Sequence, residues 1–314
     1  MQAIQVTGFG GPEVLQLREV PDPTAGAGEV LVRLRAAGVN PVDVYRRSGA
    51  YANVPTPPYI PGSDGAGEVV AVGTDVQGRQ PGDRVYVAGA PSYAQFVAAP
   101  AAAVWPLPPA LTFSQGAAIG VPYRTAYLAL HLVARAQPGE RVLVRGGTGG
   151  VGIAAIQLAA CHGCDVVATS GTETGRVLVE GEGARASCGH GDVPRLAELA
   201  DGHGYDVIIE MLANVNLGSD LTLLAPRGRV AVVGSRGEIT IDPRDIMSRS
   251  AAVLGVMGMT PEERRRIHLG LDACLRNGVL QPVVGATFPL LQAAASHRTV
   301  MSPGAHGKVV LEIP

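Results

Sequence analysis

The chain has 314 residues, of which 46% are hydrophobic and 17% charged, and its formal net charge is −2. This length exceeds that of one ordinary core and predicts two domains. The balanced charge, with no dense run of Lys and Arg, argues against a nucleic-acid or anionic-membrane partner, and no apolar run is long enough to span a bilayer. The first residues lack the basic and apolar regions of a signal peptide, so a cytoplasmic location is expected.

The first hundred residues contain short apolar runs, several of them alternating, separated by Gly and Pro turns. This pattern is typical of antiparallel strands, so a β-rich lobe extends to about Trp105. The predicted strands cover residues 4–6, 15–17, 30–36, 68–72, 84–88 and 94–98.

The periodicity changes after this lobe. Thr112 and Gln115 have the spacing of a capping box, and Ala126, Leu130 and Val133 recur at helical intervals. A linker helix is therefore expected before the next domain.

Residues 139–172 have the pattern of a strand, a glycine turn, a helix and a second strand. Gly147, Gly149 and Gly152 have GxGxxG spacing directly after the apolar run Arg141–Val144, and a largely apolar helix follows. Glycines at these positions allow a tight turn and bring backbone N–H groups and the helix N-terminus close to a pyrophosphate. The flanking strands favour dinucleotide binding over the alternative of a purely structural turn.

The tip of the second strand indicates which dinucleotide is bound. An NAD site usually has an Asp or Glu there, whereas this chain has Ser170, Gly171 and Thr172, with Arg176 one helical turn further on. Hydroxyl, backbone and guanidinium donors suit the 2′-phosphate of NADPH, although Glu173 is nearby and Arg176 could equally be a solvated surface charge. We expect NADPH.

Two further buried strands are predicted at residues 206–210 and 229–233, and each is followed by a polar loop. Ligands of such sheets bind at the carboxyl ends of the strands, so Asn214, Ser235 and Arg236 are candidate dinucleotide contacts. The alternative is that each of them only caps its loop.

The remaining pattern is a strand at residues 251–256, a charged helix over Pro261–Arg276 and a closing strand at residues 307–313. We expect the closing strand to return to the first lobe.

The four cysteines do not form a disulfide framework. Cys161 and Cys164 form a CxxC pair at the C-terminal end of the predicted helix, where the helix dipole opposes a thiolate, and no second pair completes a zinc set. Cys188 and Cys274 are predicted to be isolated.

Seven segments resemble the zeta-crystallin-type quinone oxidoreductases, a zinc-free branch of the medium-chain dehydrogenase/reductase superfamily. They are GFGGPEVL at Gly8, GVNPVDVYRRSGAY at Gly38, PYIPGSDGAGEVVAVG at Pro58, QGAAIGVPYRTAY at Gln115, GGTGGVG at Gly146, EMLANVNL at Glu210 and GRVAVVGSRG at Gly228. The resemblance implies an α/β protein with a GroES-like catalytic domain (1–117 and 265–314), a Rossmann domain with a doubly wound parallel sheet (118–264) and a homodimer or homotetramer.

The resemblance also implies which residues contact the cofactor. The matching positions are Tyr45, Thr148, Gly149, Gly150, Val151, Gly171, His190, Asn214, Val233, Gly234, Ser235, Arg236, Val256, Met257 and Gly258. His190 on its own would more often be a surface histidine, and its match to the family gives a cofactor contact equal weight with that alternative. The sequence after Val256 departs from that of animal relatives.

In zinc alcohol dehydrogenases a cysteine stands at the position of Asn40 and a histidine at that of Ser63, and neither replacement suits Zn²⁺. A metal-free site favours acceptors that are easily reduced, such as quinones, with NADPH supplying the electrons. Tyr45, Tyr51 and Asn40 are the candidate catalytic groups near the acceptor oxygen. The alternatives are an enoyl or alkenal reductase, in which Tyr51 donates a proton rather than covering the cleft, and an NADPH-binding protein without turnover of the crystallin-like or RNA-binding kind.

Overall fold

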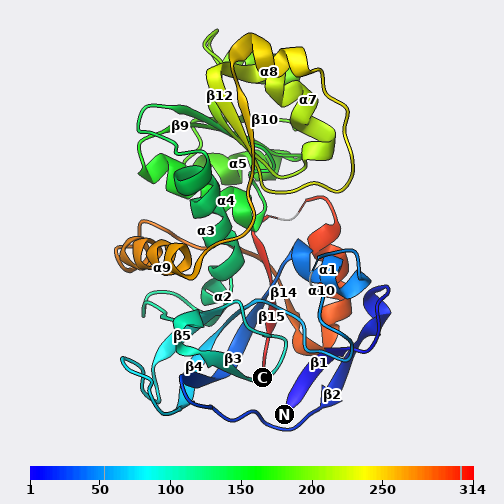
Figure 1. Ribbon diagram of the computed structural model, residues 1–314, viewed down its shortest axis with the longest axis vertical. Coiled ribbons are helices and arrows are strands. Elements are labelled where there is room, and N and C mark those ends of the chain that lie inside the picture. Colours follow the sequence, from blue (N-terminus) through cyan, green and yellow to red (C-terminus); the bar gives the residue numbers. More distant parts are fainter. Residues whose placement is uncertain (53, 305) are drawn as a thin grey trace. The chain divides into compact units, whose positions relative to one another are not determined.

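The computed structural model describes residues 1–52, 54–304 and 306–314. The chain divides into two compact units: unit 1 comprises Met1–Val121 and Gln281–Pro314, and unit 2 comprises Pro122–Leu280 (Figure 1). The domain boundary expected before residue 265 falls inside helix α9 (Pro261–Arg276), and the whole of this helix lies in unit 2. None of the helices in the described residues is long and apolar enough to cross a membrane.

Unit 2 is built on a sheet of six parallel strands. Their order is β10-β9-β8-β11-β12-β13, so the first strand of the unit lies in the centre and the direction of winding reverses between β8 and β11. This is the doubly wound Rossmann order, and it confirms the predicted fold class. The strands are β8 (Arg141–Val144), β9 (Asp165–Thr169), β10 (Ala186–Cys188), β11 (Tyr205–Glu210), β12 (Leu224–Val232) and β13 (Ala252–Gly255).

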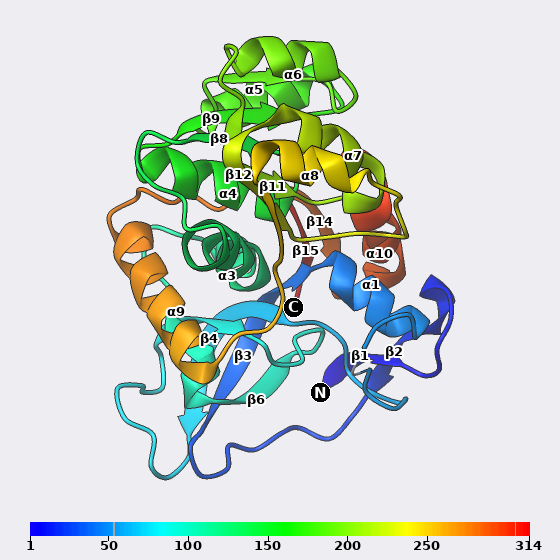
Figure 2. The same cartoon turned by 45° about the horizontal axis from the view of Figure 1, so that its top comes forward.

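Helices cover this sheet. Helices α4 and α5 contact β8, β9 and β10, whereas α7 lies against β11 and β12 and contacts both α6 and α8 (Figure 2). The central strands are correspondingly apolar on both faces: Val142, Leu143, Ile208 and Ile209 are fully buried. The other helical segments of the unit are α3 (Gly120–Tyr127, which begins in unit 1), a π-helical turn (Leu128–Val133), α4 (Gly150–Cys161), α5 (Glu173–Gly181), α6 (Val193–Leu199), α7 (Ala213–Leu223) and α8 (Pro243–Arg249).

Unit 1 contains a seven-stranded sheet in the order β14-β15-β3-β4-β5-β7, with β6 also paired to β3, and a separate hairpin of β1 and β2. All pairs are antiparallel except β14 with β15. The strands are β1 (Gln2–Val6), β2 (Leu15–Glu19), β3 (Glu29–Val39), β4 (Asp64–Val72), β5 (Arg84–Ala88), β6 (Phe96–Pro100), β7 (Val104–Pro106), β14 (Val284–Pro289) and β15 (Lys308–Glu312).

The two ends of the chain meet in this sheet. Strand β15 pairs with β3 through contacts such as Val310 with Gly38, and Figure 1 shows the red strand beside the blue one. The predicted return of the closing strand to the first lobe is thus confirmed. The unit also contains α1 (Pro41–Ser48), α2 (Phe113–Gly116) and α10 (Ala293–Met301), and the capping box at Thr112 and Gln115 is present at the start of α2.

Candidate functional site

The glycine turn connects β8 to α4. Gly149 is the N-cap of α4, and no side chain caps this end of the helix. A Cβ atom on Gly152 would lie 2.3 Å from the carbonyl oxygen of Gly146, so close packing of the helix on the turn requires glycine there. A Cβ atom on Gly149 would have no neighbour closer than 3.9 Å. The protein therefore leaves space at Gly149, at the uncapped positive end of a helix, as a pyrophosphate requires. Thr148, Gly150 and Val151 flank this position.

The turn lies where the winding of the sheet reverses. Strands β8 and β11 are neighbours, and a Cβ atom on Gly146 would lie 3.6 Å from the Cβ atom of Met211, which follows β11. Dinucleotides bind in the crevice outside the carboxyl ends of the strands at such a reversal.

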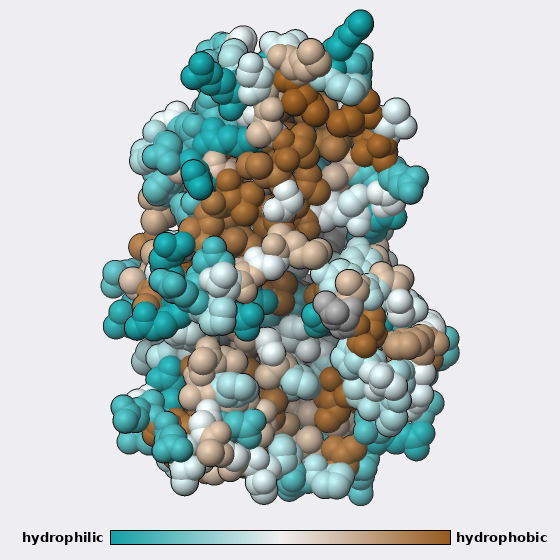
Figure 3. All heavy atoms as spheres, viewed as in Figure 1, coloured by the Kyte–Doolittle hydropathy of each residue, from teal (hydrophilic) through white to brown (hydrophobic). Residues whose placement is uncertain are grey.

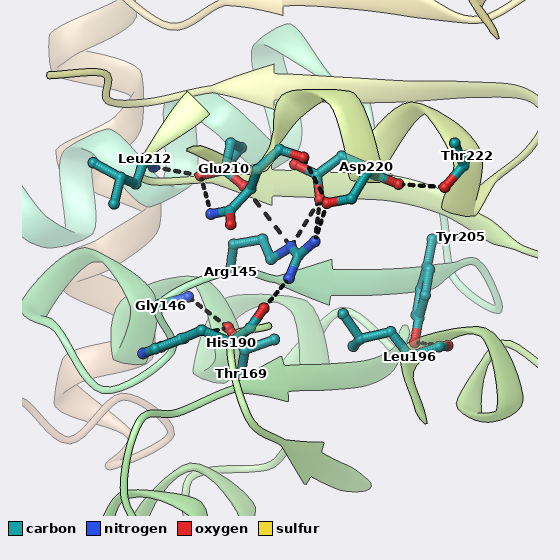
Figure 4. Close-up of polar contacts among 12 residues, drawn as sticks. Arg145, Gly146, Thr169, His190, Leu196, Tyr205, Glu210, Leu212, Asp220 and Thr222 are labelled. Atoms are coloured by element: carbon teal, nitrogen blue, oxygen red, sulfur yellow. Dashed lines mark hydrogen bonds and ion pairs between the residues drawn. The ribbon is translucent and has the colours of Figure 1, made fainter. Parts of the chain in front are cut away.

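His190 belongs to the same edge of the sheet. Its Nδ1 atom lies 2.9 Å from the hydroxyl of Thr169 at the end of β9, and this hydroxyl also accepts a hydrogen bond from the N–H of Gly146 (Figure 4). A Cβ atom on Gly171 would lie 3.3 Å from Nε2 of His190. Burial and the nearby charge of Arg145 lower the pKa of His190. The imidazole is thus neutral at physiological pH and lies beside the glycine turn.

The hydroxyls of Ser170 and Thr172, at the tip of β9, form hydrogen bonds within their own turn and at the start of α5. Ser170 is 1% exposed and donates to the carbonyl of Thr172, while the Thr172 hydroxyl accepts from the N–H of Gly175 as the N-cap of α5. Arg176 contacts Glu173 on the same helix. The Ser170 hydroxyl is thus occupied within the turn in this structure, and its contact with a 2′-phosphate stays a prediction.

The loops after β11 and β12 are tied together. The side-chain oxygen of Asn214 accepts from the N–H of Arg236 at 2.8 Å and from the hydroxyl of Ser235 at 3.4 Å. A Cβ atom on Gly234 would lie 2.5 Å from the carbonyl oxygen of Met211, so glycine is required there. Asn214 thus does cap a loop, and it brings Ser235 and Arg236 to the edge of the sheet where the glycine turn lies.

The last predicted contacts follow β13. The N–H of Val256 donates to Val232 at 2.9 Å and its side chain is buried, whereas Met257 is 78% exposed and Gly258 has a positive φ of 76°. Val233, which follows β12, donates to the carbonyl of Glu210. The structure therefore gathers the predicted cofactor residues of unit 2 at the carboxyl ends of its strands.

In unit 1 the predicted residues Tyr45 and Tyr51 form a stacked pair. Their ring centroids lie 6.4 Å apart with an interplanar angle of 20°, and the guanidinium of Arg46 lies 5.8 Å from the centroid of the Tyr51 ring. Tyr45 is on α1 and Tyr51 follows this helix, so the helix end orients both phenols.

Asn40, the third predicted catalytic residue, lies inside a buried polar cluster. Its side-chain oxygen accepts from the ammonium of Lys308, and its Nδ2 atom donates to Oδ2 of Asp64 at 2.9 Å. Asn40 is only 3% exposed, and its backbone N–H donates to Asp43. Both ends of the amide are therefore committed to neighbours within unit 1.

Asp43 extends this cluster toward α10. Burial and the nearby charge of Asp64 raise the pKa of Asp43 to about 6, against the opposing effects of its hydrogen bond to Asn40 and of the charges of Lys308 and Arg46. The hydroxyl of Tyr93 lies 3.4 Å from Asp43 and 3.2 Å from Nε2 of His297.

At the two positions where zinc alcohol dehydrogenases have metal ligands, this protein has side chains that already form hydrogen bonds with cationic groups. Ser63 accepts a hydrogen bond from Nη1 of Arg46 at 3.3 Å, and Asn40 is bound to the Lys308 ammonium. A cation at these side chains would lie beside an existing ammonium. Within the described residues, no group of three or more His, Cys, Asp or Glu side chains is placed to hold a metal ion.

Burial makes Cys164 and Cys274 unfavourable nucleophiles, and the structure corrects one expectation about Cys274. Burial, followed by the nearby charge of Glu140, raises the pKa of Cys164 to about 11. Cys274 was expected to be isolated, but Cys161 lies close enough to hydrogen-bond with it and to raise its pKa further after burial. The expectation failed because the two residues meet only when α4 and α9 are folded.

Sequence reasoning missed Arg145, Glu210, Asp220 and Lys308, all of which are buried beside predicted site residues. A signal was present for two of them. Arg145 is a charged residue between the apolar strand β8 and the glycine turn, and Asp220 is the one charged residue of α7, directly before the buried Leu221. A charge in such a position needs a buried partner, but the sequence does not identify that partner.

Two family models match the chain. Residues 26–109 match the alcohol dehydrogenase GroES-like domain, and residues 150–271 match a domain described as zinc-binding dehydrogenase. These matches confirm the predicted GroES-like and Rossmann parts.

Known proteins match over nearly the whole chain. It is 44% identical to a human quinone oxidoreductase over 320 residues, covering 99% of this chain and 97% of that protein. A mycobacterial protein complexed with NADPH has a TM-score of 0.90 at 31% identity, covering 99% of this chain and 100% of that one. An NAD-dependent alcohol dehydrogenase has a TM-score of 0.94 at 30% identity, with both chains fully covered. The chain belongs to the zeta-crystallin-type quinone oxidoreductase family of the medium-chain dehydrogenase/reductase superfamily.

Proposed function

We propose that the protein is an NADPH-dependent quinone oxidoreductase that works without a metal. The observation that carries this proposal is the glycine turn, where the space at Gly149 and the uncapped start of α4 fit a dinucleotide pyrophosphate. When bound, NADPH supplies the electrons. The names of the curated relatives, such as the human quinone oxidoreductase, support a quinone as the acceptor.

The preference for NADPH over NADH rests on the tip of β9. No carboxylate occupies residues 170–172, and Arg176 lies on the first turns of α5 with its side chain 34% exposed. The Arg176 guanidinium contacts the Glu173 carboxylate in this structure. The 2′-phosphate of NADPH would take the place of that carboxylate as the partner of Arg176. Backbone N–H groups at the start of α5 would add to this attraction.

The protein's own residues would hold the acceptor and the cofactor in place and stabilise the charge that develops on the acceptor. Tyr45 and Tyr51 would cover a flat acceptor and hold a hydroxyl near the oxygen that gains negative charge. Asn40 would act as a positioning residue, because its amide is bound to Lys308 and Asp64. On the nucleotide side, Thr148, Val151, His190 and Arg236 would orient the cofactor.

An alternative, an NADPH-dependent alkene reductase, is favoured by one observation. The Tyr51 phenol lies beside Tyr45 and under the Arg46 guanidinium, an arrangement that could hold a proton donor in place. A panel of acceptors separates the functions: NADPH oxidation by ortho- and para-quinones is compared with oxidation by enoyl thioesters and enones. Rapid turnover of quinones supports the proposal, and turnover of enones alone contradicts it. Tight NADPH binding without oxidation by any acceptor would identify a non-catalytic binding protein.

The metal-free chemistry has its own test. We expect the purified protein to carry no stoichiometric zinc and to keep its activity after prolonged chelation, because an amide and a hydroxyl stand at Asn40 and Ser63. Elemental analysis measures this directly. One zinc ion per chain would contradict both the mechanism and the assignment of these positions.

We also infer a homodimer or homotetramer. Among the residues that the structure describes, strand β13 pairs only with β12, which leaves it at the edge of the six-stranded sheet. Figure 3 shows apolar side chains gathered over unit 2, and exposed apolar residues there include Val215 on α7, Met247 on α8 and Val253 on β13. Such a surface fits a second copy of the chain. A cytoplasmic location remains the prediction from the sequence.

A further inference from the structure

Three charged side chains form a buried cluster next to the glycine turn, which we call the Arg145 cluster: Arg145, Glu210 and Asp220. The Arg145 side chain is 2% exposed and both carboxylates are 0% exposed. Nε of Arg145 donates to Oδ1 of Asp220 at 2.7 Å, and the nearest oxygen of Glu210 lies 3.9 Å from the same nitrogen. Figure 4 shows the guanidinium between the end of β8 and helix α7.

The cluster holds loops of the candidate nucleotide site. Nη1 of Arg145 donates to the backbone carbonyl of His190 at 2.7 Å, so the guanidinium fixes the segment after β10. Glu210 accepts hydrogen bonds from the backbone N–H of Leu212 and, at 3.1 Å, from the amide of Asn216, so its carboxylate fixes the segment after β11. The cluster therefore joins the segments that follow β8, β10 and β11.

The charges of the cluster do not balance if both acids are ionised. One guanidinium would then face two carboxylates in a site without water contact, which is costly. Oε2 of Glu210 and Oδ2 of Asp220 are both buried and, within the described residues, accept no hydrogen bond. A single proton between the two carboxyl groups would provide the missing donor and leave a net charge of zero.

The raised pKa of Asp220 agrees with a shared proton. Burial, the hydrogen bond that a protonated Asp220 can form with Glu210, and the charge of Glu210 raise the pKa of Asp220 to about 8, while Arg145 opposes the rise. The charged groups that act on it are thus Arg145 from the end of β8 and Glu210 from β11. His190 also feels the charges of Arg145 and Glu210, and its lowered pKa keeps it neutral in the range where Asp220 titrates.

We propose that Glu210 and Asp220 share one proton, and that this pair acts through Arg145 to position the nucleotide-binding segments at His190 and Leu212. The proposal rests on the nucleotide site of the proposed function and makes the two acids positioning residues. Loss of the shared proton places two like charges in contact in a medium of low polarity. The carboxylates then separate, the bonds to Leu212 and to the His190 carbonyl are disturbed, and NADPH binds more weakly.

The substitution Asp220→Asn tests this inference. The new amide can accept from Arg145 and donate to Glu210, so it imitates the protonated acid and cannot lose its proton. NADPH affinity is measured by nucleotide fluorescence from about pH 7 to about pH 9, one unit on either side of the Asp220 pKa of about 8. We expect the wild-type dissociation constant to rise by about threefold or more over this range, and that of the variant to stay constant. The exposed acid Glu198 on α6 provides the control Glu198→Gln, which should titrate like the wild type.

A wild-type affinity that does not change with pH, or a variant that changes as the wild type does, would overturn the proposal. If the variant does not fold, the infrared spectrum of the wild type decides: near pH 7 it should contain the carbonyl band of a protonated carboxylic acid, and absence of this band excludes the shared proton. Neither measurement uses an acceptor, so failure of quinone turnover would leave this inference intact. Failure to bind NADPH at any pH would instead contradict the proposed function, while the infrared band still tests the shared proton.

Discussion

Nζ of Lys308 lies 3.0 Å from Oδ2 of Asp64, and the two side chains are 4% and 0% exposed. Replacing Lys308 with Met leaves a buried carboxylate without its cation. We therefore expect the free energy of unfolding to fall by about 3–5 kcal/mol. Thermal or chemical unfolding measures this loss. The matched control is Arg35→Met, which breaks the more exposed pair of Arg35 with Glu68 at 3.2 Å and should cost less than about 1 kcal/mol. Equal costs for the two variants would show that the buried pair contributes no more than a surface pair.

The glycine turn allows binding to be separated from folding. Gly149→Val should keep the melting temperature near that of the wild type, because a Cβ atom there would meet no neighbour within 3.9 Å, yet its branched side chain would occupy the space of the pyrophosphate and abolish binding of NADPH and NADH. Gly152→Val should instead destabilise the fold, since its Cβ atom would lie 2.3 Å from the Gly146 carbonyl. Calorimetry and nucleotide titration of both variants measure these outcomes. Retained nucleotide binding by a folded Gly149→Val protein would contradict the assignment of the turn.

Nucleotide preference should depend on Arg176. We expect the wild type to bind NADPH at least about tenfold more tightly than NADH, which corresponds to about 1.4 kcal/mol. Arg176→Ala should remove most of this preference and leave the affinity for NADH unchanged, because only NADPH carries the 2′-phosphate. Arg195→Ala is the control, since Arg195 and Glu198 form an exposed pair with the same i,i+3 spacing on α6. A preference for NADH in the wild type would show that Glu173 governs the ribose pocket.

Tyr51 distinguishes the two enzymatic functions. In a quinone reductase, the ring of Tyr51→Phe still stacks with Tyr45 and water can supply protons to the reduced quinone, so turnover should fall by less than about tenfold. In an alkene reductase, protonation of carbon needs a positioned acid, and the loss should reach about a hundredfold or more. We expect the small loss. Steady-state kinetics with the best acceptor decide the question, provided that the NADPH dissociation constant is shown to be unchanged.

Much of the fold follows from local patterns in the sequence. The bounds of β8 and α9 agree with the predicted strand and helix, and the capping box at Thr112 is present. Apolar runs and glycine spacing identify these elements because each depends on neighbours in the sequence. The elements that the sequence analysis does not predict include helices α1, α6, α7, α8 and α10 and strands β7, β10 and β14. The residues of β14 alternate between partial burial and exposure. Its one partner strand within the described part of the chain is β15, so its strand conformation depends on distant pairing.

The sequence predicts where the candidate site lies along the backbone, but it does not predict most of the hydrogen-bond partners of the side chains. The glycine turn and the strand ends fix the place of the nucleotide, because parallel strands end at one edge of the sheet. The partners of several buried polar groups depend on tertiary contacts: Asn40 binds Lys308, and Arg145 binds Asp220. These two pairs are separated by 268 and 75 positions in the chain, and no local spacing indicates them.

The pairing of β15 with β3 also governs the order in which the nascent chain can fold. Unit 2 is one continuous stretch, Pro122–Leu280, and can acquire its complete sheet while the last residues are still within the ribosome. The long strand β3 is synthesised early and can pair with β4 and β6, but residues 36–39 at one of its edges gain their strand partner only when Lys308–Glu312 emerge. During synthesis that edge presents unpaired backbone groups to other chains, a period in which chaperones would be expected to act.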